Sequence, residues 1–490
     1  MALSEKLQWI SDSIYFLLPE FILISGILTL LITGLIIRKS NFLFPALTIL
    51  IFLIATVITL TNWPSSPVDL FTGMFRTDDF TAYLKILFLI GGIITIVMGE
   101  AGNTEKYKSE YFLLVVTIVL GSHLLVMSMN FVSLLISLEL VSISSYLLVG
   151  FGFNRQSSEG SLKYFLFGSA ATAVMIYGMS LFYGLAGTLD FSTHAFIERL
   201  IERSSPLFFI GSCMVLAGFL FKISAAPFHL WAPDVYESAP TPVVAFLSVV
   251  PKLAGLGALI KFILAVNLYG QSVYDWQTVI AIVALLSVII GNFSALWQQD
   301  TKRMMAYSSI AQSGFLLIAV AAFTLEGLHF VLFYASVFLL SNFLVFAVIH
   351  YFEQNHGTII QALSGLGRKT IIPSVLILIG LISLTGLPPT SGFTAKLFIF
   401  SSLWGAYADS GKIILLLLFI AGLVNTVVAL FFYLKIPYSL FIKSGSSEIA
   451  VTRPSALSLA LQVLLAILVL LLFFQPGLLM GWINRINFVM

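Results

Sequence analysis

The stretch FKISAAPFHLWAPDVYESAPTPV (residues 221–243) interrupts a long apolar run, and SLTGLPPTSGFTAKLFIF (residues 383–400) does the same later in the chain. Pro227 in the first stretch, and Pro388 with Pro389 in the second, lack the backbone N–H that a helix interior needs, so we expect both helices to break there. Broken helices at membrane depth persist only where they are buried in protein or line a wet cavity. The two stretches therefore predict a helical membrane protein whose functional site lies at the breaks.

The composition supports this fold class. The chain has 490 residues, of which 59% are apolar and only 9% are charged, whereas a soluble domain has about 25% charged residues. A bilayer span needs about 20 apolar residues, and such stretches follow one another through the sequence. They predict an all-α, polytopic membrane protein. A β-barrel is excluded, because barrels show short alternating segments rather than long apolar runs.

Fourteen apolar stretches are predicted to cross the membrane as helices, with spans 7 and 12 broken. Their approximate positions are 13–37, 42–61, 78–98, 111–128, 131–152, 162–186, 206–230, 241–266, 277–297, 303–324, 328–350, 372–403, 412–436 and 457–478.

An internal repeat is predicted from pairs of lysines. Lys222 and Lys396 are 174 residues apart, as are Lys261 and Lys435. Five spans separate the partners, and an odd number of spans reverses the orientation in the membrane, which is typical of inverted repeats. We expect two inverted five-helix repeats, with the chain divided into N-terminal spans 1–3 (1–110), spans 4–8 (111–266), spans 9–13 (277–436) and a C-terminal span (437–490).

The distribution of basic residues predicts the orientation. Of the 24 Lys and Arg residues, thirteen lie in odd-numbered loops and six in even-numbered loops or the termini. Cytoplasmic loops carry the excess of Lys and Arg. We therefore expect the odd loops in the cytoplasm and both termini on the opposite side.

Several functions are excluded by composition. A net charge of +2 offers no electrostatic basis for binding nucleic acid. The single cysteine, Cys213, excludes a disulfide, a cysteine zinc site and an iron–sulfur cluster within this chain. The N-terminus lacks a basic region and a small-residue cleavage site, so it is predicted to be uncleaved.

Charged residues within the predicted spans are the candidate site. Glu139 lies in the middle of LLISLELVSISSYLLVG (134–150), Lys222 and Lys396 lie in the broken spans, and Lys252 lies in span 8. A charge at membrane depth costs a few kcal/mol and usually marks an ion or proton path. We expect a horizontal relay in which a Glu139–Lys222 pair controls whether Lys222 holds its proton, since a nearby carboxylate favours the ammonium form. The competing interpretation is a set of structural ion pairs.

Other candidates are open to two interpretations. His229 follows Lys222 by seven residues and could pass protons towards Lys252, or be satisfied by hydrogen bonds at the break. Lys163, matched by His329 in the second repeat, is either a relay group or a cation at a loop edge. Lys85 and Lys261 lie nearer to span ends, where we expect them to snorkel to the headgroups. The remaining histidines show no ligand spacing, so no metal site is predicted.

Five motifs resemble a known family. They are LLPE (17–20), SLLISLELVSISSYLLVGF (133–151), FKISAAPFHLWAPDVYESAPTPVVAFLSVVPKLA (221–254), KRMMAYSSIAQSGF (302–315) and GLPPTSGFTAKLFIF (386–400). With them the sequence resembles subunit N of the proton-pumping NADH:quinone oxidoreductases (respiratory complex I). More broadly, it resembles the antiporter-like subunits related to Mrp-type antiporters. The resemblance covers nearly the whole chain.

The resemblance assigns a proton path to particular residues. In the family the path runs through a span 5 glutamate, a span 7 lysine, a span 8 lysine and a span 12 residue, which here match Glu139, Lys222, Lys252 and Lys396. Lys163 and His229 also match relay positions. The lysine at 396 is unlike the glutamate of subunit M, and the length is too short for the lateral C-terminal helix of subunit L.

The resemblance also implies function and partners. It implies a membrane subunit that translocates protons while the complex transfers electrons from NADH to quinone. NADH, FMN, iron–sulfur clusters and quinone are then bound by other subunits, and this chain holds no cofactor. The implied partners are subunits L and M, the smaller subunits A, J, K and H, and membrane lipid. The implied location is the bacterial inner (plasma) membrane, with a thylakoid membrane as the second possibility.

Three alternatives stay open at this point. The chain could be a stand-alone or Mrp-type cation/proton antiporter, because lysines do not reveal which ion moves. It could be a non-pumping scaffold whose charges only hold helices together. It could also be a membrane subunit of an energy-converting hydrogenase, which would change the electron partner.

Overall fold

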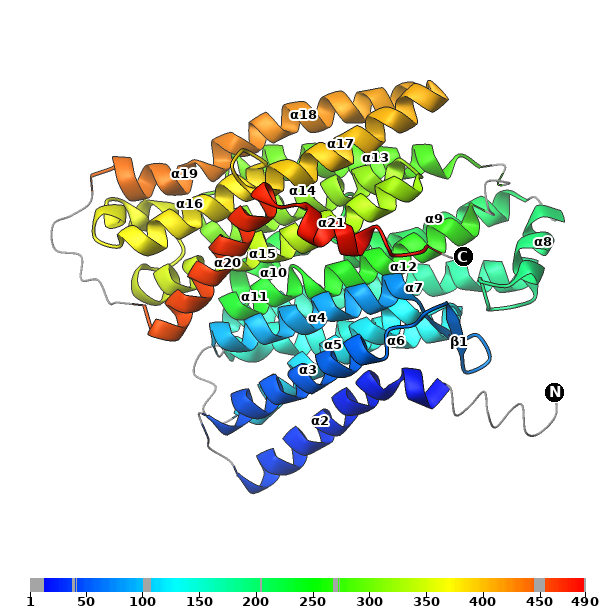
Figure 1. The fold of residues 1–490 in the computed structure, drawn as a ribbon, viewed down its shortest axis with the longest axis horizontal. Helices are drawn as coiled ribbons and strands as arrows, with labels where there is room; N and C mark the ends of the chain where they lie inside the picture. The colour runs from blue at the N-terminus through cyan, green and yellow to red at the C-terminus, as the bar shows by residue number, and fades with distance from the viewer. Residues whose placement is uncertain are drawn as a thin grey trace.

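A bundle of long helices forms almost the whole molecule (Figure 1). The computed structural model describes residues 13–37, 40, 42–99, 107–202, 205–267, 272, 274–444 and 454–488. The long helices lie side by side, and a small hairpin of β1 (Val68–Leu70) and β2 (Phe75–Thr77) lies at one end of the bundle. The hairpin is antiparallel, with Val68 paired to Thr77. The lysine and arginine residues at 6, 38, 39, 106, 203 and 453, which entered the orientation argument, lie outside the described residues.

Helices follow one another along the chain. Up to the first break they are α2 (Leu18–Ile36), α3 (Leu43–Thr61), α4 (Asp79–Met98), α5 (Lys108–Met127), α6 (Phe131–Val149), α7 (Arg155–Ala186), α8 (His194–Glu202) and α9 (Pro206–Lys222). From there they are α10 (Ala232–Ser238), α11 (Thr241–Leu247), α12 (Val250–Val266), α13 (Trp276–Ala295), α14 (Thr301–Ala321), α15 (Leu325–His356), α16 (Ile371–Thr385), α17 (Ser391–Ser410), α18 (Ile413–Tyr433), α19 (Lys435–Pro437), α20 (Ala456–Phe474) and α21 (Gly477–Ile483).

The predicted class of polytopic all-α membrane protein is confirmed. Within the part of the chain that the structure describes, twelve helical stretches are long and apolar enough to cross a membrane. Two further apolar helices, α9 and α16, are shorter, at 17 and 15 residues. Both end at the predicted breaks. The total of fourteen crossings, which counted each broken segment once, stays a prediction.

Both predicted breaks are present. Helix α9 ends at Lys222 and α10 begins at Ala232, while α16 ends at Thr385 and α17 begins at Ser391. Gly386 closes α16 with a φ of 89°, a left-handed conformation that glycine adopts without steric cost. The prolines lie between the half-helices in each case, where no helical hydrogen bond is required of them.

The centre of the bundle is shielded from lipid. In α14 and α15, 94% of the most apolar stretch is buried, and in the segment of α11 and α12 all of it is. The corresponding share is 28% in α2 and 33% in α20, whose exposed leucine and isoleucine side chains suit contact with lipid. The breaks therefore pack against central helices, as expected for irregular backbone at membrane depth.

Candidate functional site

Three lysines are buried at or beside the two breaks. Lys222 is the last residue of α9, Lys252 lies in the first turn of α12, and Lys396 lies in α17 just beyond the second break. Their exposed fractions are 1%, 3% and 4%. Burial of a lone ammonium costs several kcal/mol unless oxygen atoms surround it. The partners of each lysine therefore decide what the site can do.

Lys222 is bound through a serine of α6. Its Nζ donates to Ser142 Oγ at 3.1 Å. Glu139, three residues earlier on the same helix face, accepts a hydrogen bond of 2.7 Å from Thr172 Oγ1 of α7. Within the described residues no ion pair joins Glu139 directly to Lys222 in this structure, and the predicted control of Lys222 by Glu139 stays a prediction. Ser142 and Thr172 satisfy the two groups separately.

Lys252 is held by helix α14. Its Nζ donates to Ser309 O at 3.0 Å, to Ser309 Oγ at 2.6 Å and to Ser313 Oγ at 3.3 Å. Ser313 Oγ in turn donates to the carbonyl of Ile223 at 2.6 Å. Since Ile223 directly follows Lys222, Ser313 links the first break to Lys252.

The same face of α14 reaches the second break. Gln312 Nε2 donates to Leu384 O at 3.0 Å, and Lys396 Nζ donates to the next carbonyl, Thr385 O, at 2.8 Å. Lys396 Nζ also lies 3.9 Å from the ring centre of Phe315, close enough for a cation–π contact. Lys252 and Lys396 thus contact α14 directly, while Lys222 is followed by Ile223, whose carbonyl accepts a hydrogen bond from α14. We call the three lysines and this face of α14 the central row.

The α14 residues of the central row were not predicted from the sequence. Ser309, Gln312 and Ser313 lie within the motif KRMMAYSSIAQSGF (302–315) but were not identified as site residues. Their spacing of i, i+3 and i+4 places them on one helix face. A polar stripe at this spacing in an otherwise buried helix is the signal that identifies them.

Lys163 lies in a different environment. Its Nζ pairs with Glu159 and with Asp234, each at 2.9 Å, and its side chain is 41% exposed. Arg303 joins the same group by pairing with Asp234 at 3.0 Å and Glu237 at 2.6 Å. These five residues form a surface network, and in the described chain no hydrogen bond or ion pair joins Lys163 to the central row.

His229 is buried in the first break, with 8% of its surface exposed. In the described residues its Nδ1 has no hydrogen-bond partner, and no hydrogen bond joins it to Lys222 or Lys252. His329, the predicted counterpart of Lys163, contacts the carbonyl of Ile486 through Nε2 at 2.9 Å. Among the described residues no group of three or more His, Cys, Asp or Glu residues could hold a metal ion.

The expected snorkelling of Lys85 and Lys261 is wrong. Lys85 Nζ lies 2.9 Å from Glu20 Oε1, and Lys261 Nζ lies 3.5 Å from Asp78 Oδ2, with the lysine side chains 3% and 8% exposed. Each carboxylate comes from a neighbouring helix or its cap, so these lysines have partners inside the protein and need no headgroup.

Two broken helices with buried lysines, inside a bundle of membrane-spanning helices, define the class of multi-pass membrane proteins with a transporter-type core. Comparison with known families identifies the group within this class. Residues 128–447 match the family model described as NADH:quinone oxidoreductase/Mrp antiporter, transmembrane region. The chain belongs to this family, and the predicted resemblance is confirmed.

Individual relatives agree with this assignment. The chain is 36% identical to NADH-quinone oxidoreductase subunit N 2 of Chloroherpeton thalassium, over 87% of this chain and 85% of the relative. It is also similar to a chain of respiratory complex I from Thermus thermophilus, with 29% identity, a TM-score of 0.80, and 95% and 99% of the two chains covered. A chain of the Mrp complex from Dietzia sp. shares the fold, with a TM-score of 0.80 at 20% identity and 95% and 96% coverage.

Proposed function

We propose that the chain is a membrane subunit of NADH:quinone oxidoreductase that translocates protons along the central row while other subunits transfer electrons from NADH to quinone. The observation that carries this proposal is that three buried lysines lie at or beside both breaks and that α14 bonds to Lys252, to Ile223 O next to Lys222 and to Leu384 O at the second break. The family membership and the near full-length similarity to relatives named subunit N support the assignment to this complex.

The central row supplies groups that can hold and pass a proton. A buried ammonium is disfavoured by loss of water, and a nearby carboxylate restores it. When Glu139 leaves Thr172 and turns to Lys222, the lysine holds its proton; when Glu139 returns, the lysine releases it. The proton then passes through water beside Ser313 and His229 to Lys252, and along the polar face of α14 to Lys396, which releases it.

The orientation and location are part of the proposal. The surface network around Asp234 lies beside predicted odd-numbered loops, so we place it at the cytoplasmic face. There Lys163 and Arg303 hold carboxylates at the surface, next to water. Both termini then lie on the opposite side.

A multi-pass protein of this family fits the bacterial inner membrane. The exposed apolar faces of α2, α3, α18 and α20 suit packing against other membrane subunits and lipid. We propose subunits L, M, A, J, K and H as those partners, with NADH, FMN, iron–sulfur clusters and quinone bound elsewhere in the complex.

We also propose that the chain contains two inverted halves, 111–266 and 277–436, between an N-terminal unit (1–110) and a C-terminal unit (437–490). Two isolated β-bridges support this: Asn130 pairs with Asp190 ahead of α6, and Asp300 pairs with Ile359 ahead of α14. The paired positions are 170 and 169 residues apart, and α7 and α15, which follow, each have 32 residues. The 174-residue spacing of the lysines differs from this period, so the proposal rests on the bridges and helix lengths rather than on the lysines.

Co-purification tests the assignment to a complex. When membranes are solubilised in a mild detergent and this chain is captured, we expect mass spectrometry to find flavin- and iron–sulfur-containing subunits together with other antiporter-like chains. Recovery of Mrp-type subunits instead, or of this chain alone, would contradict the proposal and favour a cation/proton antiporter. Recovery of a hydrogenase in place of the flavin subunits would change the electron donor.

The contacts of Lys252 give a second test. Replacing Ser309 and Ser313 together by alanine leaves Lys252 Nζ with a single backbone carbonyl, and each lost partner of a buried polar group costs about 1–3 kcal/mol. We expect a lower melting temperature and a reduced proton-to-electron ratio in proteoliposomes. Ser180→Ala is the control, since Ser180 is exposed on α7 and its Oγ donates to Tyr177 O of its own helix. An unchanged ratio in the double variant would show that α14 does not take part in proton transfer.

A further inference from the structure

A second group of buried charges lies outside the central row. Glu20 of α2 places Oε1 2.9 Å from Lys85 Nζ of α4 and 2.8 Å from His123 Nδ1 of α5. The exposed fraction of each of the three side chains is 3% or less. We call this group the N-terminal triad. It joins three helices that precede both breaks, and the proposed function makes no use of it.

Two polar atoms of the N-terminal triad are free to bind a further group. Glu20 Oε2 and His123 Nε2 are buried and have no hydrogen-bond partner in the described part of the chain. Leaving such an atom unpaired costs about 1–3 kcal/mol of stability. A role in stability alone therefore does not explain why the triad contains two of them. An imidazole is the group that accepts and passes protons near neutral pH, and the Glu20 carboxylate beside it favours its charged form.

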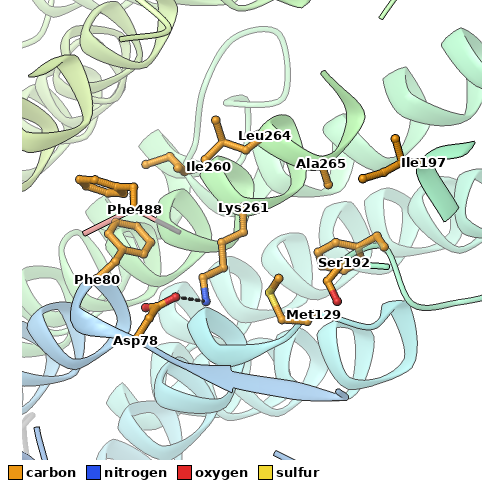
Figure 2. A pocket seen from close by; sticks show the side chains of 11 residues that line it. Asp78, Phe80, Met129, Ser192, Ile197, Ile260, Lys261, Leu264, Ala265 and Phe488 are labelled. Atoms are coloured by element: carbon orange, nitrogen blue, oxygen red, sulfur yellow. Dashed lines mark ion pairs between the residues drawn. The ribbon is translucent and has the colours of Figure 1, made fainter. Parts of the chain in front are cut away.

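A second ion pair follows along α4. Asp78 caps this helix through Oδ1, which accepts from Thr81 N at 2.7 Å, while Oδ2 lies 3.5 Å from Lys261 Nζ of α12. Figure 2 shows the Lys261 side chain extending from α12 towards Asp78. Lys85 follows Asp78 by seven residues, two helical turns and roughly 10 Å along one face. The triad and the pair therefore lie on the same side of α4.

The Asp78–Lys261 pair lines a small cavity (Figure 2). Phe80, Ile260, Leu264 and Phe488 supply apolar walls, and the cavity has room of about 40 Å³ for the centres of water molecules. One buried water needs about 10–15 Å³ by this measure. The space therefore suits more than one water.

The ammonium of Lys261 has hydrogen-bond donors that such waters could accept. Its Nζ is buried and makes no hydrogen bond to any described residue, although an ammonium carries three donors. Water in the cavity can accept these donors and connect Lys261 to the end of the bundle that carries the β1–β2 hairpin, because Asp78 directly follows β2. A hydrated, buried amine next to a carboxylate is a site from which a proton can leave.

We propose that the N-terminal triad and the Asp78–Lys261 pair form a second proton-carrying line beside the central row, which releases protons through this cavity. The inference rests on the proposed function. In the release step an N–H bond of the Lys261 ammonium breaks and its proton joins a cavity water, leaving a neutral amine and an ionised Asp78. The amine regains a proton from the triad along α4, where Lys85 and His123, paired with the Glu20 carboxylate, hold the next one.

An arginine at position 261 separates this role from a structural one. Arginine keeps the positive charge opposite Asp78 but does not release its proton. In the assembled complex, reconstituted in proteoliposomes, we expect Lys261→Arg to lower the proton-to-electron ratio by the same fraction as Lys222→Met, with normal assembly. Lys412→Arg is the matched control, because Lys412 forms an exposed pair with Asp275 at 2.7 Å, and we expect it to leave the ratio unchanged.

Each outcome has a distinct meaning. If Lys222→Met lowers the ratio and Lys261→Arg does not, the second line is overturned and the pair only stabilises the fold. If neither variant lowers the ratio, the proposed function fails and the second line fails with it. Should Lys261→Arg not assemble, Asp78→Asn is measured in the same way: asparagine retains the helix cap, and loss of the carboxylate is expected to lower the ratio per assembled complex.

Discussion

Replacing Lys222 by methionine is expected to abolish the proton pumping that this chain contributes while leaving the complex assembled. Methionine fills most of the volume of the lysine stem but cannot carry a proton. The hydrogen bond that is lost is the one to Ser142 Oγ, and Glu139 keeps its hydrogen bond from Thr172 Oγ1, so the carboxylate is not left without a partner. The measurement is the proton-to-electron ratio of the purified complex in proteoliposomes, with the rate of NADH oxidation recorded in parallel.

The controls define what this result means. Lys412→Met removes an exposed lysine of the same chain, and exposed ion pairs contribute about 0–1 kcal/mol, so we expect normal pumping. Lys222→Arg keeps the charge but not the ability to release a proton, and we expect it to fail like methionine. A Lys222→Met complex that pumps at the ratio of the unsubstituted complex would refute the central row as the proton path.

The second large effect is expected from Gly392→Ala at the second break. Gly392 N donates to Ser383 Oγ at 3.2 Å, and a Cβ at this position would collide with the backbone carbonyl of Ser383. Relief of this collision requires α16 and α17 to move apart, which strains the hydrogen bonds that join them across the break. We expect the free energy of unfolding to fall by about 3 kcal/mol, as for an overpacked core. Lys396 would also be displaced from Thr385 O.

Gly405→Ala, in the same helix α17, is the matched control. A Cβ at Gly405 meets nothing within 4 Å, and alanine is favoured over glycine in a helix by about 0.5–1 kcal/mol. We expect its melting temperature in detergent to be equal to or above that of the unsubstituted chain. Equal melting temperatures for the two variants would show that the contact between Gly392 and Ser383 does not hold the break together.

The sequence was sufficient for features that depend on neighbouring residues. Proline removes a helical hydrogen bond when it stands in a helix interior, so the breaks at Pro227 and Pro388 were predicted correctly. Apolar neighbours in the sequence also predict that a charged residue is buried, and Lys222, Lys252 and Lys396 are buried as expected. The family could be recognised for the same reason, because its motifs are continuous in the sequence.

The hydrogen-bond partners of these charges could not be predicted, because they come from distant parts of the chain. Lys163 meets Asp234 across 71 residues, and Glu20 meets His123 across 103. The local sequence around a lysine near a span end is the same whether its side chain reaches the headgroups or a carboxylate on the next helix. For that reason the snorkelling of Lys85 was predicted wrongly.

By itself, the sequence determined the membrane-spanning helical class, the two breaks, the family and the buried lysines, since apolar length, proline and continuous motifs act locally. Only the tertiary structure decided that Lys222 forms its hydrogen bond with Ser142, that α14 contacts both breaks, and that Lys163 belongs to a surface network. The physical reason is that a buried charge must find oxygen or nitrogen partners wherever packing supplies them. Which helices pack together is a property of the whole bundle rather than of any one segment.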